Sequence, residues 1–121
     1  MKKKVLVIDD ELSLCEVIKD FLDSLGYQTY MAIDAIQGLE MIEREKPDVV
    51  LLDILMPEVS GLECLQRIKK SRPNTIVIII SGMQDEELAK SAIRHGAYDY
   101  ITKPFDLDFL ENNLLARIFP S

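Results

Sequence analysis

Short apolar runs alternate with stretches of helical periodicity from one end of the chain to the other. The apolar runs cover residues 4–9, 27–32, 48–53, 75–81 and 98–102. Runs of this length that are rich in β-branched residues are typical of strands, and the first, third and fourth runs are apolar throughout. We therefore predict five strands, three of which are buried on both faces.

Between these runs, apolar residues recur at intervals of three and four, which is the spacing of one helix face. Helices are predicted over 11–25, over 34–46, from Ser60 with Leu62, Leu65 and Ile68 inward, over 85–95, and from Asp106 with Leu107, Leu110, Leu114 and Ile118 inward. Asp34 is a suitable N-cap, and Ser60 with Glu63 has the spacing of a capping box. Gly26 and Gly96 follow the ends of two of these helices, as helix-terminating glycines do.

The regular alternation of strand and helix predicts an α/β fold with a doubly wound, five-stranded parallel sheet. The second and fifth strands are shorter or more polar than the others, as expected of strands at the edges of a sheet. The strand order 2-1-3-4-5, the flavodoxin-like arrangement, places them there. A length of 121 residues is sufficient for one domain and too short for two, so we predict a single domain over residues 1–121.

Composition and charge narrow the classes of function. The formal net charge is −7, and this argues against nucleic acid or an anionic membrane as a direct partner. No apolar run approaches the roughly 18 residues that a membrane-spanning helix needs, so we expect a soluble, cytoplasmic protein. The two cysteines, Cys15 and Cys64, lie in predicted helices without metal-ligand spacing, and we expect them to be reduced packing residues.

The residues that suggest chemistry follow the predicted strands. Asp9 and Asp10 end the first strand, Asp53 ends the third, Ser81 ends the fourth, and Lys103 follows the fifth. In an open parallel sheet the carboxyl ends of the strands line one crevice, so these side chains are expected to lie together. Carboxylates about 4 Å apart repel by about 4 kcal/mol at an effective dielectric constant of 20, and a single lysine does not cancel three of them. Either a proton or a divalent cation must therefore be present. An all-oxygen cluster without a nearby His or Cys favours a hard cation, and Mg²⁺ over Ca²⁺.

The order and spacing of these residues resemble the receiver domain of two-component response regulators, the CheY-like superfamily, over essentially the whole chain. The matching positions are Asp9-Asp10-Glu11, Asp53-Ile54-Leu55-Met56-Pro57, Gly61, Ser81-Gly82, Tyr100 and Lys103-Pro104-Phe105. Each of these motifs is weak alone, but all of them in this order are highly specific. The resemblance implies a phosphoryl-accepting signalling switch and not a turnover enzyme.

Roles for individual residues follow from the resemblance. Asp53 would be the phosphoacceptor, and Mg²⁺ would be held directly by Asp10, Asp53 and the main-chain carbonyl of Leu55. Asp9 would act mainly through a metal-bound water. The family also implies a cis peptide bond between Lys103 and the proline that follows it.

The remaining site residues would act on the phosphoryl group and on the switch. By resemblance, Lys103 contacts one phosphoryl oxygen and the Ser81 hydroxyl contacts another. As Ser81 moves toward the phosphoryl group, the ring of Tyr100 moves into the space it leaves. This movement would change the surface formed by the fourth helix, fifth strand and fifth helix.

The partners implied are a sensor histidine kinase or phosphotransfer protein, an output domain or downstream protein, and a phosphorylation-linked homodimer. Apolar residues beyond one core stripe, Phe109, Leu115 and Phe119, also suggest an interaction surface on the last helix. Three alternatives share the topology. A flavodoxin-like cofactor binder would need phosphate-binding amides where the acidic residues lie, and an aspartyl-phosphate-forming hydrolase would need a cap and an Asp-x-Asp motif. A degenerate receiver used only for docking would not need the complete acceptor set.

Overall fold

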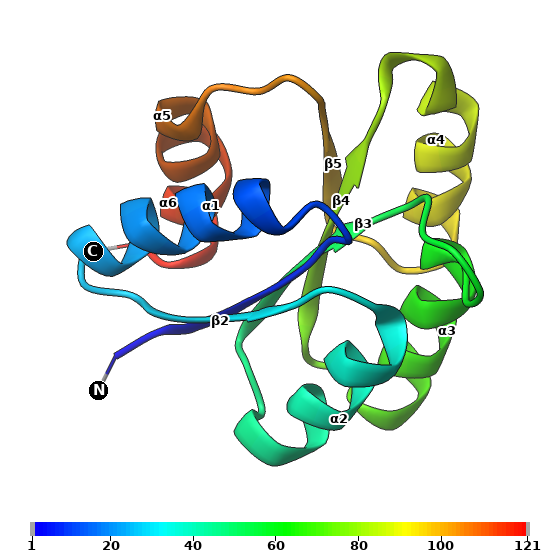
Figure 1. The fold of residues 1–121 in the computed structure, drawn as a ribbon, viewed down its shortest axis with the longest axis horizontal. Coiled ribbons are helices and arrows are strands. Elements are labelled where there is room, and N and C mark those ends of the chain that lie inside the picture. Colours follow the sequence, from blue (N-terminus) through cyan, green and yellow to red (C-terminus); the bar gives the residue numbers. More distant parts are fainter. Residues whose placement is uncertain (1, 121) are drawn as a thin grey trace.

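A computed structural model describes residues 2–120 as a parallel sheet between two layers of helices (Figure 1). The strands are β1 (Lys4–Ile8), β2 (Gln28–Ala32), β3 (Val49–Asp53), β4 (Ile76–Ser81) and β5 (Asp99–Thr102). Their order is β2-β1-β3-β4-β5 with every neighbouring pair parallel, so the predicted fold class and strand order are confirmed. The predicted domain, 1–121, includes one residue at each end that lies outside the described part.

The sheet divides the apolar interior into two layers, because alternate residues of a strand point to opposite faces. The helices around it are α1 (Leu12–Ser24), α2 (Ala35–Glu45), α3 (Gly61–Ser71) and α4 (Glu86–Arg94), with a C-terminal helix after β5. Val5 and Val7 of β1 pack with α1 and the C-terminal helix. Leu6 and Ile8 pack with α2, α3 and α4 on the other side. No helix within residues 2–120 is both long and apolar enough to cross a membrane.

The helix starts follow the predicted caps, with one difference. Asp34 accepts a hydrogen bond from the amide of Gln37 at 2.7 Å, which is the expected N-cap of α2. Ser60 Oγ accepts a hydrogen bond from the amide of Glu63 at 3.2 Å. The Glu63 carboxylate contacts Arg67 at 2.8 Å, one turn further along α3. Of the two hydrogen bonds of the predicted capping box, the one from the Glu63 amide to the Ser60 side chain is present, whereas the Glu63 carboxylate contacts Arg67 instead.

Two of the helix ends depend on backbone conformations that favour glycine. Gly26 and Gly96 have φ angles of 97° and 108°, as expected for residues that follow a helix end. The end of α2 uses Lys46 in the left-handed region, with a φ of 50°. The helix predicted over 34–46 therefore ends with a left-handed residue immediately before Pro47.

The C-terminal helix differs from the regular helix that the sequence predicts. It consists of α5 (Leu107–Phe109), a π-helical segment η2 (Leu110–Leu115) and α6 (Ala116–Ile118). The wider π turn directs both Leu114 and Leu115 into the interior. Phe119 packs near the ring of Tyr27, with 6.0 Å between the ring centroids. Of the three residues that suggested an interaction surface, Phe109 is exposed, Phe119 is partly buried and Leu115 is fully buried, so the suggestion is wrong for Leu115.

Candidate functional site at the carboxyl edge of the sheet

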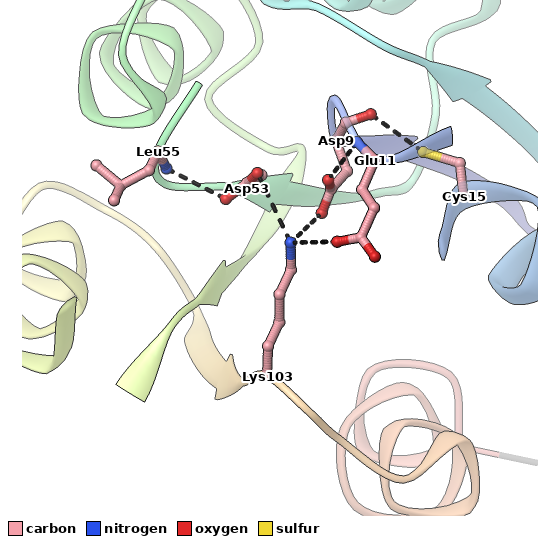
Figure 2. Close-up of polar contacts among 6 residues, drawn as sticks. All are labelled: Asp9, Glu11, Cys15, Asp53, Leu55 and Lys103. Atoms are coloured by element: carbon pink, nitrogen blue, oxygen red, sulfur yellow. Dashed lines mark hydrogen bonds and ion pairs between the residues drawn. The ribbon is translucent and has the colours of Figure 1, made fainter. Parts of the chain in front are cut away.

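Acidic side chains and one ammonium group meet where the strands end (Figure 2). Asp9 follows β1, Asp53 is the last residue of β3, and Lys103 follows β5. Lys103 Nζ lies 3.0 Å from Asp9 Oδ2, 3.4 Å from Glu11 Oε1 and 3.8 Å from Asp53 Oδ2. One ammonium group is therefore shared by three carboxylates.

Backbone hydrogen bonds beyond the strand ends fix this geometry. The amide of Asp9 donates to the carbonyl of Ala32 at 3.1 Å, and the amide of Lys103 donates to the carbonyl of Ser81 at 2.7 Å. Both bonds continue the pairing of neighbouring strands by one residue. The peptide bond between Lys103 and Pro104 is cis, as the resemblance implies.

Asp9, Asp10 and Asp53 form a group whose carboxylate oxygens lie within 4.8 Å of one another. Asp9 and Asp53 are buried, whereas Asp10 is exposed. Burial, and next the charge of Asp9, raise the pKa of Asp53 to about 7, although the Leu55 amide and Lys103 act in the opposite direction. A crowded, all-oxygen donor set with excess negative charge fits a hard divalent cation such as Mg²⁺.

Lys103 supplies the positive charge that partly balances this cluster. Burial disfavours its charged form, but contacts with Asp9, Asp53 and Glu11 outweigh the burial and raise the pKa of Lys103. The ammonium is therefore charged at neutral pH. It opposes more carboxylates than it can neutralise, so the site keeps a negative field that attracts cations.

Ser81 and Tyr100, the two predicted switch residues, are placed differently. The Ser81 side chain is fully buried, and its Oγ has no hydrogen-bond partner among residues 2–120. Leaving a buried hydroxyl unpaired costs about 1–3 kcal/mol, so this position is unusual for a purely structural residue. Tyr100 packs on the same side of the sheet as α4, and its Oη lies 3.4 Å from Glu86 Oε1.

The loop after β3 is held close to Asp53 by its backbone. The amide of Leu55 donates to Asp53 Oδ1 at 3.2 Å, while the Leu55 side chain is half exposed. The amide of Gly61, the first residue of α3, donates to the carbonyl of Ile54 at 3.0 Å. A Cβ at Gly61 would lie 2.5 Å from the carbonyl oxygen of Asp53 and 2.7 Å from that of Ile54. Only glycine lets α3 start this close to the strand.

Two contacts of the site were not predicted from the sequence. Glu11, part of the acidic motif but without a predicted role, contacts Lys103. Cys15, on the first turn of α1, donates from Sγ to the main-chain carbonyl of Asp9 at 3.2 Å. Burial, and next Asp9, raise the pKa of the Cys15 thiol to about 11. Both predicted packing cysteines, Cys15 and Cys64, are free and buried. The contact of Cys15 with the site could have been predicted from its position one helical turn after Glu11.

Comparisons with known proteins agree with this geometry. Residues 5–115 match the family described as the response regulator receiver domain. The transcriptional regulatory protein CrdR of Helicobacter pylori is 40% identical over 92% of this chain, and the chain spans 53% of that protein. The chemotaxis protein CheY of Thermotoga maritima is 38% identical over 87% of this chain and 88% of its own length. The crystal structure of the receiver domain of NtrX from Brucella abortus superposes with a TM-score of 0.89 at 39% identity, over 97% of this chain and 99% of that one.

Proposed function

The chain belongs to the response regulator receiver domain family of two-component signalling proteins, and we propose that Asp53 is its phosphoacceptor. Receiver domains are phosphoacceptor signalling modules and not turnover enzymes, and this chain is such a switch. The family match excludes the flavodoxin-like cofactor binder and the hydrolase considered above. The observation that carries the proposal is the position of Asp53, beside Asp9 and within 3.8 Å of Lys103.

The proposed reaction is an in-line transfer to a carboxylate oxygen of Asp53. This oxygen attacks phosphorus, and the bond from phosphorus to the donor breaks. The leaving group, an imidazole nitrogen of phosphohistidine or the acetate of acetyl phosphate, takes the bonding electron pair. Because a carboxylate is a weak nucleophile, alignment and charge compensation supply most of the rate. Lys103, already shared among the carboxylates, would compensate the charge of a phosphoryl oxygen.

The acidic cluster is proposed to hold Mg²⁺. Asp9, Asp10 and Asp53, with the main-chain carbonyl of Leu55, would be the residues that hold it. When bound, the cation supplies positive charge that compensates the transferring phosphoryl oxygens. The excess of carboxylates over Lys103 and the raised pKa of Asp53 support this assignment.

Ser81 and Tyr100 are proposed to transmit the phosphorylation signal. The unpaired hydroxyl of Ser81 is a donor that a phosphoryl oxygen would satisfy. Tyr100 Oη makes a long contact of 3.4 Å with Glu86 Oε1, and its ring packs on the side of the sheet that α4 covers. Movement of both residues would alter the surface made by α4, β5 and α5.

Residues 1–121 are proposed to act as one receiver unit within a signalling pathway. Its phosphodonor would be a sensor histidine kinase or a phosphotransfer protein. Its target would be an output domain or a downstream protein, since relatives named as transcriptional regulatory proteins are longer than this chain. A phosphorylation-linked homodimer is a second proposed form. The net charge of −7 supports a role without direct nucleic-acid contact.

Intact-mass measurement after incubation with acetyl phosphate and Mg²⁺ tests the assignment of Asp53. We expect the chain to gain one phosphoryl group, and the gain to disappear in Asp53→Asn. Asp20→Asn, which alters an exposed carboxylate of α1, is the matched control and should gain one group as the unsubstituted chain does. A phosphorylated Asp53→Asn, or an unmodified wild-type chain, would contradict the proposal.

A further inference from the structure

Among residues 2–120, Glu11 is the one carboxylate that contacts Lys103 and that the proposed reaction does not use. We propose that Glu11 is a positioning residue that competes with the phosphoryl group for Lys103 and so slows phosphorylation of Asp53. This inference rests on the proposed function. Its chemical basis is that an ammonium group held by one carboxylate has to leave it, at least in part, to contact a phosphoryl oxygen.

Of the three carboxylates that contact Lys103, Glu11 lies at the intermediate distance from the ammonium nitrogen. Its Oε1 lies 3.4 Å from Nζ, nearer than Asp53 Oδ2 at 3.8 Å and further than Asp9 Oδ2 at 3.0 Å. Figure 2 shows the carboxylates of Glu11 and Asp53 on different sides of the ammonium group. A pull toward Glu11 is therefore directed away from the proposed acceptor.

Hydrogen bonds hold the backbone of Glu11, whereas its side chain borders open space. Its amide donates to Asp9 Oδ1 at 2.9 Å, and its carbonyl accepts from the amides of Leu14 and Cys15 at 3.1 and 3.2 Å. The side chain borders an open cavity of about 380 Å³ whose lining is Glu11, Leu14, Lys103, Pro104 and Phe105. The carboxylate can therefore leave Lys103 by side-chain rotation alone, without disturbing the start of α1.

Exposure sets the size of the expected effect. The Glu11 side chain is 57% exposed and that of Lys103 is 27% exposed, so water and salt weaken their attraction. Asp9, which is fully buried, holds the ammonium more firmly. We therefore expect removal of the Glu11 carboxylate to accelerate phosphorylation by roughly two- to five-fold, an effect of the size of an exposed ion pair.

Three substitutions separate competition for Lys103 from general repulsion of an anionic donor. In Glu11→Gln the carboxylate is lost, whereas Glu11→Asp keeps the charge on a side chain too short to reach Nζ as before. Glu16→Gln, an exposed position of α1, is the control with the same change in net charge. With acetyl phosphate and Mg²⁺ at low salt, we expect both Glu11 variants to be phosphorylated two- to five-fold faster and Glu16→Gln to match the wild type. The acceleration should shrink as salt is added.

Glu11→Asp decides between the two explanations. If it reacts at the wild-type rate while Glu11→Gln is faster, simple charge repulsion accounts for the effect and the competition is overturned. The competition is also overturned if both Glu11 variants are phosphorylated at the wild-type rate or more slowly.

A second measurement does not depend on phosphorylation. The ¹⁵N chemical shift of Lys103 Nζ in the metal-free protein should change in Glu11→Gln and Glu11→Asp and stay constant in Glu16→Gln. An unchanged shift in the Glu11 variants would overturn the contact on which the inference depends. If the wild-type chain takes up no phosphoryl group while the shift changes as expected, the proposed function fails and the contact stands. The two failures are therefore distinguishable.

Discussion

The negative charge of an ionised Asp53 is poorly compensated by the groups around it. It is buried at the end of β3, close to Asp9 and Asp10, and the shared ammonium of Lys103 lies 0.8 Å nearer to Asp9 (3.0 Å) than to Asp53 (3.8 Å). Burial and the charge of Asp9 accordingly raise the pKa of Asp53 from 3.8 to about 7. Without a bound cation, the ionised Asp53 carboxylate therefore destabilises the folded protein.

This destabilisation by Asp53 depends on pH. A carboxyl group whose pKa is higher in the folded than in the unfolded state binds more protons when folded, so its contribution to stability is full below about pH 4 and is lost as the pH rises through about 7. In metal-free buffer at pH 8 we expect Asp53→Asn to be more stable than the wild type by about 2 kcal/mol. At pH 4 the difference should nearly vanish. Urea unfolding at both values measures it.

The control for this prediction is Asp20→Asn on α1, at an exposed position that forms no ion pair with the described residues. It should change the free energy of unfolding by less than about 0.5 kcal/mol at either pH. An advantage of Asp53→Asn that grows as the pH falls would contradict the assignment of its charge as destabilising.

The composition of the site could be predicted residue by residue, but its internal contacts could not. The proximity of Asp9, Asp53 and Lys103 was predictable. Hydrophobic runs indicate where the strands end, and the carboxyl ends of parallel strands meet at one edge of the sheet. The contact of Glu11 with Lys103 depends on a side-chain rotamer over an open cavity. No periodicity in the sequence encodes that choice.

At the scale of elements, the strands and most helix ends follow from local signals. Hydrophobic runs identify β1, β3 and β4, and glycines mark the ends of α1 and α4. The π-helical segment η2 was not predictable, because its residues fit a regular helix equally well. The packing of Leu115 and Phe119 against the rest of the core decides in favour of the wider turn.

The register of η2 can be tested by two substitutions in the same helix. Leu115 is fully buried and Phe109 is 47% exposed. We expect Leu115→Ala to reduce the free energy of unfolding by about 2–5 kcal/mol, the range for a large apolar side chain removed from a core. Phe109→Ala should reduce it by less than about 1 kcal/mol. Urea unfolding of both variants gives the comparison, and similar losses at the two positions would contradict the π-helical register.

At the scale of the whole molecule, cation binding and folding are linked. Asp9 and Asp10 follow β1, and Asp53 is the last residue of β3, so the three carboxylates meet only in the folded sheet. A cation that needs all of them binds the folded state alone, and so stabilises it by mass action.

The expected effect is a dependence of stability on Mg²⁺. At ten times the dissociation constant, Mg²⁺ should raise the free energy of unfolding of the wild type by about 1.4 kcal/mol, and removal with EDTA should reverse the gain. Unfolding curves at matched ionic strength measure it. Asp10→Asn should lose most of the gain, and an equal gain in that variant would show that Mg²⁺ acts elsewhere.

The two-layered interior has a practical consequence. Cys15 lies in the layer between the sheet and α1, and Cys64 lies in the layer between the sheet and α3. Both thiols are fully buried, and burial raises the pKa of each to about 11, so neither reacts with an alkylating reagent until its surroundings open. The chain thus carries one native chemical reporter on each side of its sheet. Labelling rates at the two thiols measure separately how often each half of the protein opens.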